Sequence, residues 1–573
     1  MRWGDWLLVD DGVEPPPLRR SGPWAVARRS GGRTLYKAPP AGWVGAPVRE
    51  ITVDGGAVWL FGDSALGDAD VARLAWEGDA SALGGRFLLL SCRDGVFEVV
   101  TDRFNTIHAY AVDGGRVASS SFLAASALSR RQLDWPALVP FFACGFFLGE
   151  GTYWRDVRCL GPARRHRLCG PRDAQRPERY WRWRYAPDGS RPASETVEAF
   201  AEVFDRVVGD AAAGGGVALP LSGGLDSRAL CAAAPASTLA WTFGYGYQPG
   251  SVEVEIAERL ARARGLPFTG FVIEPYLHRE IDRGFDLLEG FQDLTQTRQL
   301  AVADALGERA ERVLAGHWGD VWLDDMGLGA VDGGDKQAVL ARALGKLRKR
   351  GRGWLLEHLC APALGVDPEA LLEAQVADAL EPYGDLDGAD FRLKAFKTDH
   401  WSARWTLASV RAYRASAWPV LPFYDPRLAD FFATVPARAL EDRRLEIAYL
   451  TRFAPDLARV PWQETGAPLG RSRRRAYWGG LPRRAAAKAW RLARRRPAVE
   501  RNWEVQLRSP PGRRLLEERL LAPGLRLHDL VAPAVVRALL DDFHGRPSSS
   551  PDYAASGYTV SMLLTFAVLL ERT

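Results

Sequence analysis

The chain has 573 residues, which is too long for one ordinary hydrophobic core and predicts two or more domains. Hydrophobic residues make up 47% and charged residues 25% of the chain, a balance that excludes a disordered or membrane-embedded protein. The formal net charge of +5 is small for this length and indicates no particular class of partner.

No segment has the features of a membrane anchor or a secretion signal. The most apolar stretch, residues 139–148, is too short to span a bilayer and predicts a buried helix or turn. The start of the chain includes Asp5 and shows no apolar core with a cleavage site. We therefore expect no signal peptide, no transmembrane segment and a cytoplasmic location.

The six cysteines predict neither a zinc site nor a disulfide framework. They are scattered without any Cys-x-x-Cys spacing, at Cys92, Cys144, Cys159, Cys169, Cys231 and Cys360. We expect them to be reduced residues of the core.

Short alternating segments dominate the first part of the chain. Examples are residues 57–61, 86–92 and 96–100, which are separated by Gly and Asp turns. This pattern predicts a β-rich domain. A connector rich in Pro, Arg and Trp then predicts a linker, and helical periodicity dominates from a first predicted helix at 195–204 onward.

The most informative motif follows an apolar run at residues 216–220 and precedes a helical segment that begins at Arg228. We interpret it as strand, tight loop and helix, and its residues are Leu221, Ser222, Gly223, Gly224, Leu225, Asp226 and Ser227. Two glycines let backbone N–H groups converge, two serines add hydroxyl donors, and the helix directs its positive end at the loop. These features predict an anion-binding cradle that is neither a Walker loop nor a Gly-x-Gly-x-x-Gly turn.

Asp226 adds a carboxylate to this predicted phosphate site. A carboxylate beside phosphates is repulsive unless a divalent cation lies between them, so Asp226 predicts Mg²⁺. Predicted strands at 238–243 and 267–273 flank a predicted helix at 253–264, which indicates a parallel sheet with ligands at the carboxyl ends of its strands. Gly244 follows one such strand, where an adenine could lie against bare backbone; a plain turn glycine is the alternative.

The motif Ser-Gly-Gly-x-Asp-Ser at residues 222–227 resembles the pyrophosphate loop of ATP pyrophosphatases that form AMP, and the surrounding chain resembles the asparagine synthetase family. A second apolar run, residues 313–320, resembles the family's Gly-Glu-Gly-Ala-Asp-Glu motif, with Gly316 and Asp320 matching. Asp226 and Asp320, one from each of two neighbouring strand ends, could clamp a hydrated Mg²⁺ on the β and γ phosphates. The resemblance therefore implies ATP and Mg²⁺ as cofactors.

The amino-terminal residues resemble the glutaminase domain of that family, a sandwich of antiparallel sheets between helices. The matching segments are 83–87, 102–103 and 118–120. Glutamine hydrolysis in the family needs a cysteine at position 2, exposed by removal of the initiator Met, whereas this chain has Arg2. The family's Asn-Gly-Glu glutamine-binding segment is replaced by residues 59–63. We expect this domain to keep its fold as a structural partner and not to hydrolyse glutamine.

Two more candidate site residues depart from the family pattern. His317 stands where the family has a glutamate that positions the nucleophile or intermediate; a structural histidine is the alternative. Arg444 lies in a segment, 443–450, that supplies a catalytic lysine in the family; a surface arginine is the alternative. Arginine can hold charge on phosphate but cannot exchange a proton near neutrality. Residues 415–425 resemble the family's helix that ends in Pro-Phe-Leu-Asp near the acyl-acceptor pocket.

Residues 470–497 form an arginine-rich insertion interleaved with Tyr477, Trp478 and Trp490. Such charge density suits an acidic peptide, a phosphate-rich polymer or a membrane face, and a solvated insertion is the alternative. No recognised nucleic-acid-binding module accompanies it, so we expect no nucleic-acid partner.

Together these patterns predict an α/β fold class, with an α+β amino-terminal domain that forms an N-terminal-nucleophile-like β-sandwich between helices. A parallel-sheet ATP-pyrophosphatase domain with a helical carboxyl-terminal part follows it. The predicted units are a degenerate glutaminase-like domain (1–170), a linker (171–194) and an asparagine synthetase-like domain (195–573). The resemblance implies an AMP-forming carbon–nitrogen ligase: a small-molecule or peptide carboxylate is activated as an acyl-adenylate and then attacked by an amine.

Two alternatives stay open. Among relatives that lost the cysteine, lasso-peptide cyclases and β-lactam synthetases close a ring within one substrate, so a cyclase is the second hypothesis. A non-catalytic nucleotide-binding scaffold is a hypothesis of another class. His317 and Arg444 favour the scaffold, whereas Ser222, Asp226 and Asp320 argue against it.

Overall fold

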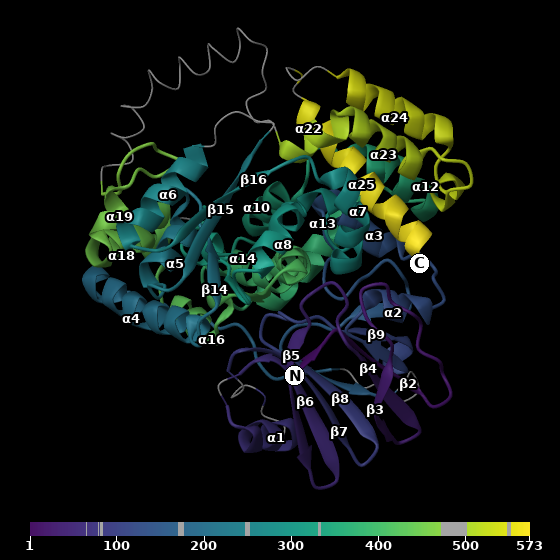
Figure 1. The fold of residues 1–573 in the computed structure, drawn as a ribbon, viewed down its shortest axis with the longest axis horizontal. Helices are drawn as coiled ribbons and strands as arrows, with labels where there is room; N and C mark the ends of the chain where they lie inside the picture. Colours follow the sequence, from purple (N-terminus) through teal and green to yellow (C-terminus); the bar gives the residue numbers. More distant parts are fainter. Residues whose placement is uncertain are drawn as a thin grey trace.

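The computed structural model describes residues 1–64, 66–77, 80, 84–169, 177–246, 252–329, 334–470, 501–546, 550 and 552–573. Except for Gly470, the arginine-rich insertion lies outside the described residues, and a partner there stays a prediction. Figure 1 shows antiparallel strands from the amino-terminal part of the chain below a parallel sheet that is surrounded by helices. The described part of the chain is mixed α/β, as the sequence predicts.

Two antiparallel sheets form the amino-terminal part. The larger sheet has the order β1-β5-β6-β7-β8-β12-β13, with strands Arg2–Trp3, Ala46–Val53, Gly56–Asp63, Arg86–Arg93, Val96–Thr101, Arg164–Leu168 and Glu178–Arg179. The smaller sheet has the order β11-β9-β10-β2-β4-β3, with strands Val157–Cys159, Tyr110–Val112, Val117–Ser119, Asp5–Asp10, Arg33–Ala38 and Ala25–Ser30. The strands predicted from the three alternating segments are confirmed as β6, β7 and β8.

Alternation along β6 separates two apolar clusters. Trp59 shares one buried cluster with Trp6 of β2, so this face of the larger sheet packs on the smaller sheet. Val58 and Leu60 point to the opposite face and belong to a second cluster with α1 (Asp68–Glu77). The period of two in the sequence therefore produces a sandwich with a helix on its outer face.

The most apolar stretch of the chain forms a buried helix, α3 (Trp135–Cys144), as the sequence predicts. Asp134 caps its amino end, and Gly145 ends it at a φ of 88°. Phe142 packs edge-on against an aromatic ring of α25 (Tyr553–Arg572). This helix thereby connects the amino-terminal sheets to the last helices of the chain.

A five-stranded parallel sheet has the order β16-β15-β14-β17-β18, with strands Phe268–Ile273, Leu239–Tyr245, Val217–Pro220, Arg312–Leu314 and Trp418–Val420. Helices α4 (Ala193–Ala212), α5 (Leu225–Ala233) and α6 (Val252–Arg264) lead into β14, β15 and β16, which confirms the predicted alternation of strand and helix. The order of the strands reverses between β14 and β17. In open parallel sheets, ligands bind in the crevice at such a reversal.

The remaining chain is mainly helical. Besides α2 (Phe122–Ala127), the other described α-helices are α7 (Leu277–Leu288), α8 (Ala303–Gly307), α9 (Gly319–Trp322), α10 (Lys336–Leu347), α11 (Arg352–Leu355), α12 (Ala361–Leu364), α13 (Pro368–Leu380), α14 (Ala389–Lys397), α15 (Leu407–Val410), α16 (Pro426–Phe432), α17 (Ala437–Leu440), α18 (Arg444–Phe453), α19 (Pro455–Arg459), α22 (Asn502–Arg508), α23 (Pro510–Leu520) and α24 (Pro533–Gly545). Two π-helical segments, η5 (Leu356–Cys360) and η7 (Thr398–Thr406), and 3₁₀ turns such as η8 (Arg411–Ala415) lie between them. None of the helices in the described ranges is both long and apolar enough to cross a membrane.

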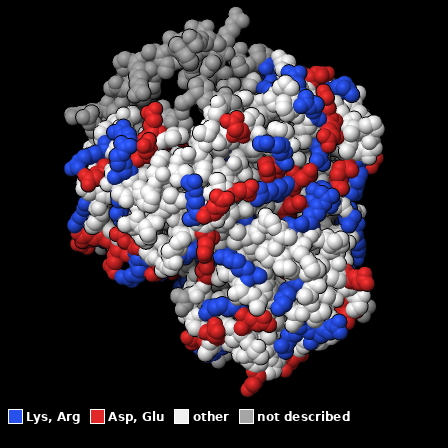
Figure 2. Space-filling model, in the orientation of Figure 1, with Lys and Arg blue, Asp and Glu red and all other residues white. Residues whose placement is uncertain are grey.

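Polar contacts join the amino-terminal sheets to the parallel-sheet part. Arg404 of η7 donates to the backbone oxygens of Gly149 and Gly151, each at 2.8 Å. Arg179 of β13 pairs with Asp399 at 2.8 Å. Figure 2 shows that Lys or Arg and Asp or Glu side chains are interspersed on one face of the molecule. The predicted domain boundaries stay predictions.

Candidate functional site

The two predicted motifs come together at the carboxyl ends of β14 and β17, the region where an open parallel sheet has its ligand crevice. The cradle, residues 222–227, follows β14, and the second loop, residues 316–320, follows β17. Because β14 and β17 are paired parallel neighbours, both loops leave the sheet at the same edge. This edge lies at the reversal of the strand order, where a bound nucleotide is expected.

Serine hydroxyls and the start of α5 form the cradle. Ser222 Oγ and Ser227 Oγ lie 2.9 Å apart, and Ser227 Oγ accepts a hydrogen bond from Ser222 N at 3.1 Å. Ser222 Oγ accepts from the N–H of Gly224, the residue before the first turn of this nine-residue helix. Leu221 and Leu225 are buried and anchor the two ends of the loop. Hydroxyls and a helix amino end on one side of a loop suit an anion.

A buried arginine holds another segment over the cradle. Arg228 of α5 is completely buried and donates to Val460 O at 2.7 Å and to Pro461 O at 3.0 Å. The same segment carries Gln463, whose N–H donates to Gly223 O at 3.2 Å. A Cβ at Gly223 would lie 2.7 Å from the Gln463 side chain. This close approach requires a glycine at position 223. Gln463 therefore packs directly on the cradle, a contact that the sequence alone does not indicate.

Asp226 and Asp320 share one electrostatic environment. A Cβ at Gly319, next to Asp320, would lie 2.8 Å from Asp226 Oδ1. Burial is the largest cause that raises the pKa of Asp226, the charge of Asp320 raises it further, and Arg443 lowers it. The resulting pKa of Asp226 is about 6. The charges of the two predicted carboxylates therefore act on each other.

The cation next to Asp226 is Arg443, the residue before the predicted Arg444. Arg443 Nη2 contacts Asp226 Oδ1 and lies 2.6 Å from Oε2 of the buried Glu446. Burial raises the pKa of Glu446 to about 8, although Arg443 opposes this shift. Arg444 has an exposed side chain that pairs with Glu441 at 3.1 Å. Because Arg443 precedes α18 in a left-handed conformation and Arg444 is the first residue of the helix, the two side chains point in different directions.

Left-handed backbone conformations occur on both sides of the crevice. Asp442 and Arg443 have φ values of 55° and 62°, and Trp318 in the second loop has a φ of 78°. Each such residue costs about 1–3 kcal/mol and persists only where its surroundings fix it. The Trp318 indole donates to Thr398 Oγ1 at 3.1 Å and stacks on Tyr424 at a centroid distance of 6.4 Å. Strain in two segments that meet at one crevice is typical of a functional site.

His317 is a neutral imidazole near pH 7. Burial and the charge of Arg298 lower its pKa to about 4, although Asp320 raises it. Its ring lies edge-on to Tyr413 at 6.0 Å, and its Nδ1 atom is buried without a hydrogen-bond partner in the described part of the chain. A group with so low a pKa is a poor proton acceptor near neutrality. The position suits a hydrogen bond to a bound group, or a structural role.

Lys397 of α14 is a second buried cation that the sequence alone did not indicate. Its Nζ lies 5.5 Å from the ring centre of Trp318 and 4.8 Å from that of Trp401. Burial lowers its pKa to about 8, and the charge of Asp320 opposes this shift. No carboxylate of the described ranges forms an ion pair with it. Lys397 therefore offers a positive charge on the Asp320 side of the crevice.

The two predicted binding glycines have different surroundings. A Cβ at Gly316 would lie 3.3 Å from the side chain of Leu230 and 3.7 Å from Asp226, so close packing on α5 favours glycine there. Gly244 lies near the carboxyl end of β15, the strand next to β14. A Cβ at Gly244 would approach Val254 to 3.4 Å, which is an ordinary contact. The role of Gly244 toward an adenine stays a prediction.

The residues of the crevice fit a divalent cation that is shared with phosphates. Mg²⁺ is usually bound through one or two carboxylates together with the phosphates of a nucleotide. Asp226 and Asp320 supply two carboxylates in and beside the predicted phosphate cradle. Arg443 Nη2 forms a hydrogen bond with Oδ1 of Asp226. Across the described ranges, no three His, Cys, Asp or Glu side chains are grouped as an all-protein metal site.

Comparison with known proteins identifies one family in this part of the chain. The model of the family described as Asparagine synthase matches residues 199–329, from α4 through the cradle to the segment after Asp320. The matched range ends before β18 and Arg443. No curated protein matches the chain significantly. The match supports the asparagine synthase family for residues 199–329, and with it a ligase-type enzyme that forms amide bonds with ATP.

Proposed function

We propose that this protein is an AMP-forming carbon–nitrogen ligase that activates a carboxylate as an acyl-adenylate. One observation carries the proposal: the cradle, residues 222–227, which contains Asp226, lies beside the loop that contains Asp320, at the point where the strand order of a parallel sheet reverses. A phosphate-binding helix terminus with two carboxylates suits a nucleotide triphosphate with its cation. The family match over residues 199–329 supports the same general chemistry.

The proposed reaction has two bond-forming steps. A carboxylate oxygen of the substrate attacks the α-phosphorus of ATP, and the bond to the bridging oxygen breaks, so that pyrophosphate leaves. An amine then attacks the acyl carbon, AMP leaves with the electrons of the acyl–oxygen bond, and the amine loses a proton. Hydroxyl and N–H donors of Ser222, Gly224 and Ser227 hold the departing pyrophosphate, which lowers the barrier through charge stabilisation.

Three charged groups complete the proposed site. Mg²⁺, when held by Asp226 and Asp320, supplies neutralisation of the phosphate charges. Arg443 positions Asp226, because one guanidinium contacts both Asp226 and the buried Glu446. Lys397 adds a positive charge beside the second loop, where the acyl-phosphate end of the substrate is proposed to lie.

We propose further that the amine does not come from glutamine. A glutaminase nucleophile must be an accessible thiol with a pKa near or below its ordinary value. All cysteines except Cys169 are buried, and burial raises the pKa of Cys144, Cys231 and Cys360 to about 12. Free ammonia or an amine of a substrate is therefore the proposed nucleophile.

The test is product analysis with purified protein, ATP and Mg²⁺. The first assay uses aspartate as the carboxylate and ammonium as the amine source. The second uses a panel of peptides that each carry both a carboxylate and an amine. We expect AMP, pyrophosphate and a new amide from the wild type, none of them from Asp226→Asn, and retained activity in Arg444→Gln. Formation of ADP and phosphate would contradict the proposal. ATP binding without turnover across the panel would favour a scaffold, and a ring-closed product would specify a cyclase.

A further inference from the structure

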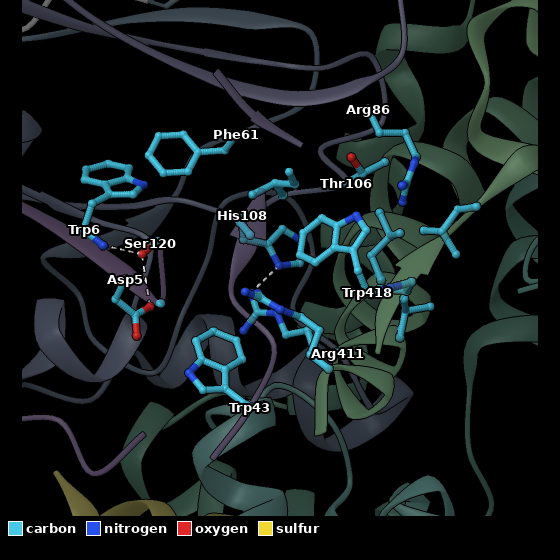
Figure 3. A pocket seen from close by; sticks show the side chains of 18 of the residues that line it. Asp5, Trp6, Trp43, Phe61, Arg86, Thr106, His108, Ser120, Arg411 and Trp418 are labelled. Carbon is cyan, nitrogen blue, oxygen red and sulfur yellow. Dashed lines mark hydrogen bonds between the residues drawn. The ribbon is translucent and has the colours of Figure 1, made fainter. Parts of the chain in front are cut away.

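A narrow cavity of about 60 Å³ lies between the amino-terminal sheets and the segment that leads into β18. Asp5, Trp43 and His108 line it from the amino-terminal part, and Arg411 and Trp418 line it from the other part. Figure 3 shows these side chains converging on the cavity from separate segments. None of the lining residues belongs to the cradle or to the second loop, so the cavity is separate from the nucleotide crevice.

Two buried carboxylates neutralise two arginines at the cavity. Arg20 forms two hydrogen bonds with Asp5, at 2.7 and 3.0 Å, and lies 3.2 Å from Glu289. Arg411 pairs with the other oxygen of Glu289 at 3.0 Å. Asp5 and Glu289 are 2% and 0% exposed, so solvent does not screen these pairs. A third lining arginine, Arg86, has its own partner, because its Nη2 lies 2.6 Å from the partly exposed Asp63.

Arg414 is the lining arginine that forms no ion pair with a carboxylate of the described residues. Its guanidinium stacks on the Trp43 ring at 3.8 Å, and its Nε donates to Val44 O at 2.9 Å. Its Nη2 atom is buried and has no hydrogen-bond partner among the described residues, none of whose carboxylates forms an ion pair with it. Burial is the largest cause that lowers its pKa, and the charges of Arg20 and Arg411 lower it further, whereas the charges of Asp5 and Glu289 oppose the shift.

The neighbouring titratable groups supply no negative charge. His108 Nε2 lies 2.6 Å from Ala403 O, and its Nδ1 lies 2.5 Å from Arg411 Nη2. Burial and Arg411 lower the pKa of His108 well below its ordinary value, so the ring is neutral. Burial raises the pKa of Tyr110, which accepts from Arg411, so its hydroxyl stays protonated. The cavity therefore carries one excess positive charge, and such a charge away from water is costly unless it is paired.

We propose that this cavity binds a small carboxylate anion between Arg411 and Arg414, with Trp43 as its aromatic wall. The proposal goes beyond the proposed ligase activity, because it concerns neither ATP nor the amide product. A carboxylate matches the planar fork of a guanidinium better than a spherical or tetrahedral anion does. One water needs about 10–15 Å³ of such space, so the cavity accepts an anion of the size of acetate and excludes a sugar acid.

The bound anion would connect two parts of the chain. Trp43 and Arg20 come from the amino-terminal part, whereas Arg411 and Arg414 belong to η8, which leads into β18. Val44 N also donates to Arg414 O at 2.6 Å, so the same two segments are already in contact. An anion that satisfies Arg414 would stabilise this contact and hence the folded chain.

The test compares acetate with gluconate at equal ionic strength, using thermal unfolding and calorimetry of the full-length protein. Both are carboxylates, but gluconate is too large for the cavity. We expect acetate to raise the melting temperature with a saturating concentration dependence and to bind with measurable heat, and gluconate to do neither. Equal effects of the two anions on the wild type would overturn the proposal, and this comparison needs no variant.

Variants locate the site. Arg414→Gln removes the excess charge and is expected to weaken acetate binding by at least about tenfold, the loss typical of a hydrogen bond to a charged group. The control is Arg262→Gln, because Arg262 is an exposed arginine that pairs with Glu258 on α6 at 2.9 Å. An unchanged acetate response in Arg414→Gln would place the anion elsewhere, for example in the phosphate cradle, and would overturn the proposal. If Arg414→Gln does not fold, Arg414→Lys replaces it in the test. This variant keeps the positive charge but lacks the two parallel N–H donors of the guanidinium, so we expect it to bind acetate more weakly than the wild type.

Discussion

Arg443 contacts the Asp226 carboxylate across 217 residues of sequence, and the same guanidinium is fixed by the buried Glu446 at 2.6 Å. The contact joins the start of α18 to the first turn of α5. Arg443 opposes the effect of burial on the pKa of this carboxylate, which we propose as a Mg²⁺ ligand. The proposed site therefore includes a residue that lies far outside the range matched by the family model, residues 199–329.

Replacing Arg443 with Met tests this relationship. The pKa of Glu446, already about 8, then rises further, so the carboxyl is protonated near neutral pH and is left buried without its partner, which costs about 1–3 kcal/mol of unfolding free energy. We also expect AMP formation to fall by at least about tenfold, because Asp226 loses the group that positions it. Denaturant unfolding and nucleotide analysis measure the two effects.

Two further variants separate positioning from folding. Arg443→Met combined with Glu446→Met removes the unpaired buried carboxyl, so the stability is expected to recover while the activity stays low. Arg444→Met alters the exposed neighbour and is expected to match the wild type in both measurements. Recovery of activity together with stability in the double variant would assign Arg443 a purely structural role.

Gly319 is predicted to tolerate no side chain. A Cβ there would lie 2.8 Å from Asp226 Oδ1 and 2.9 Å from the ring of Phe423, so Gly319→Ala must displace the carboxylate or the ring. Misplacement of this size can reduce activity by about 10- to 100-fold. We expect a rise in the Mg²⁺ concentration needed for half-maximal ATP turnover.

Gly345 of α10 provides the matched control, because nothing lies within 4 Å of a Cβ built there. Alanine in a helix interior is favoured over glycine by about 1 kcal/mol. Gly345→Ala should therefore be as active as the wild type and slightly more stable. A Gly319→Ala enzyme with unchanged Mg²⁺ dependence would show that the second loop does not set the position of Asp226.

His166 of β12 is predicted to make the folded protein sensitive to acid. It is 6% exposed, and burial and Arg164 lower its pKa to about 4, against about 6.5 in an unfolded chain. The unfolded state therefore takes up a proton at this residue as the pH falls through about 6.5, whereas the folded state does not, and stability is lost down to about pH 4. Near pH 5 the loss is about 1–2 kcal/mol.

His166→Gln removes this titration. The variant is expected to be less stable than the wild type near neutral pH and to close part of that gap near pH 5. Urea unfolding followed by tryptophan fluorescence at the two pH values measures the difference. Parallel stability curves for the two proteins would show that His166 is not buried as a neutral group.

Local signals in the sequence predict the supports of the site, but not its contacts. Alternation predicts β6 and β7, and the order of strand, glycine loop and helix predicts the cradle between β14 and α5. Each of these features depends on residues close in sequence, so propensity and period are sufficient.

The partners that face the cradle come from distant segments. Gln463 reaches the cradle and Lys397 reaches the second loop through tertiary packing, which one sequence does not encode as a pattern. Whether Arg443 or Arg444 points toward Asp226 depends on the left-handed φ of Asp442 and Arg443. Asp adopts this conformation more often than most residues, but Arg does not, so the sequence does not predict it at Arg443. Arg444 instead pairs with Glu441 at the surface, and its catalytic role stays a prediction.

The central claim is that this crevice transfers AMP to a carboxylate, and the fate of labelled oxygen tests it most directly. The substrate carboxylate identified by the product screen is labelled with ¹⁸O, and the nucleotide and phosphate products are analysed by mass spectrometry. We predict one ¹⁸O atom in AMP and none in pyrophosphate, with no labelled product from Asp226→Asn. Label in inorganic phosphate beside ADP would mean that the γ-phosphate is attacked and would contradict the account.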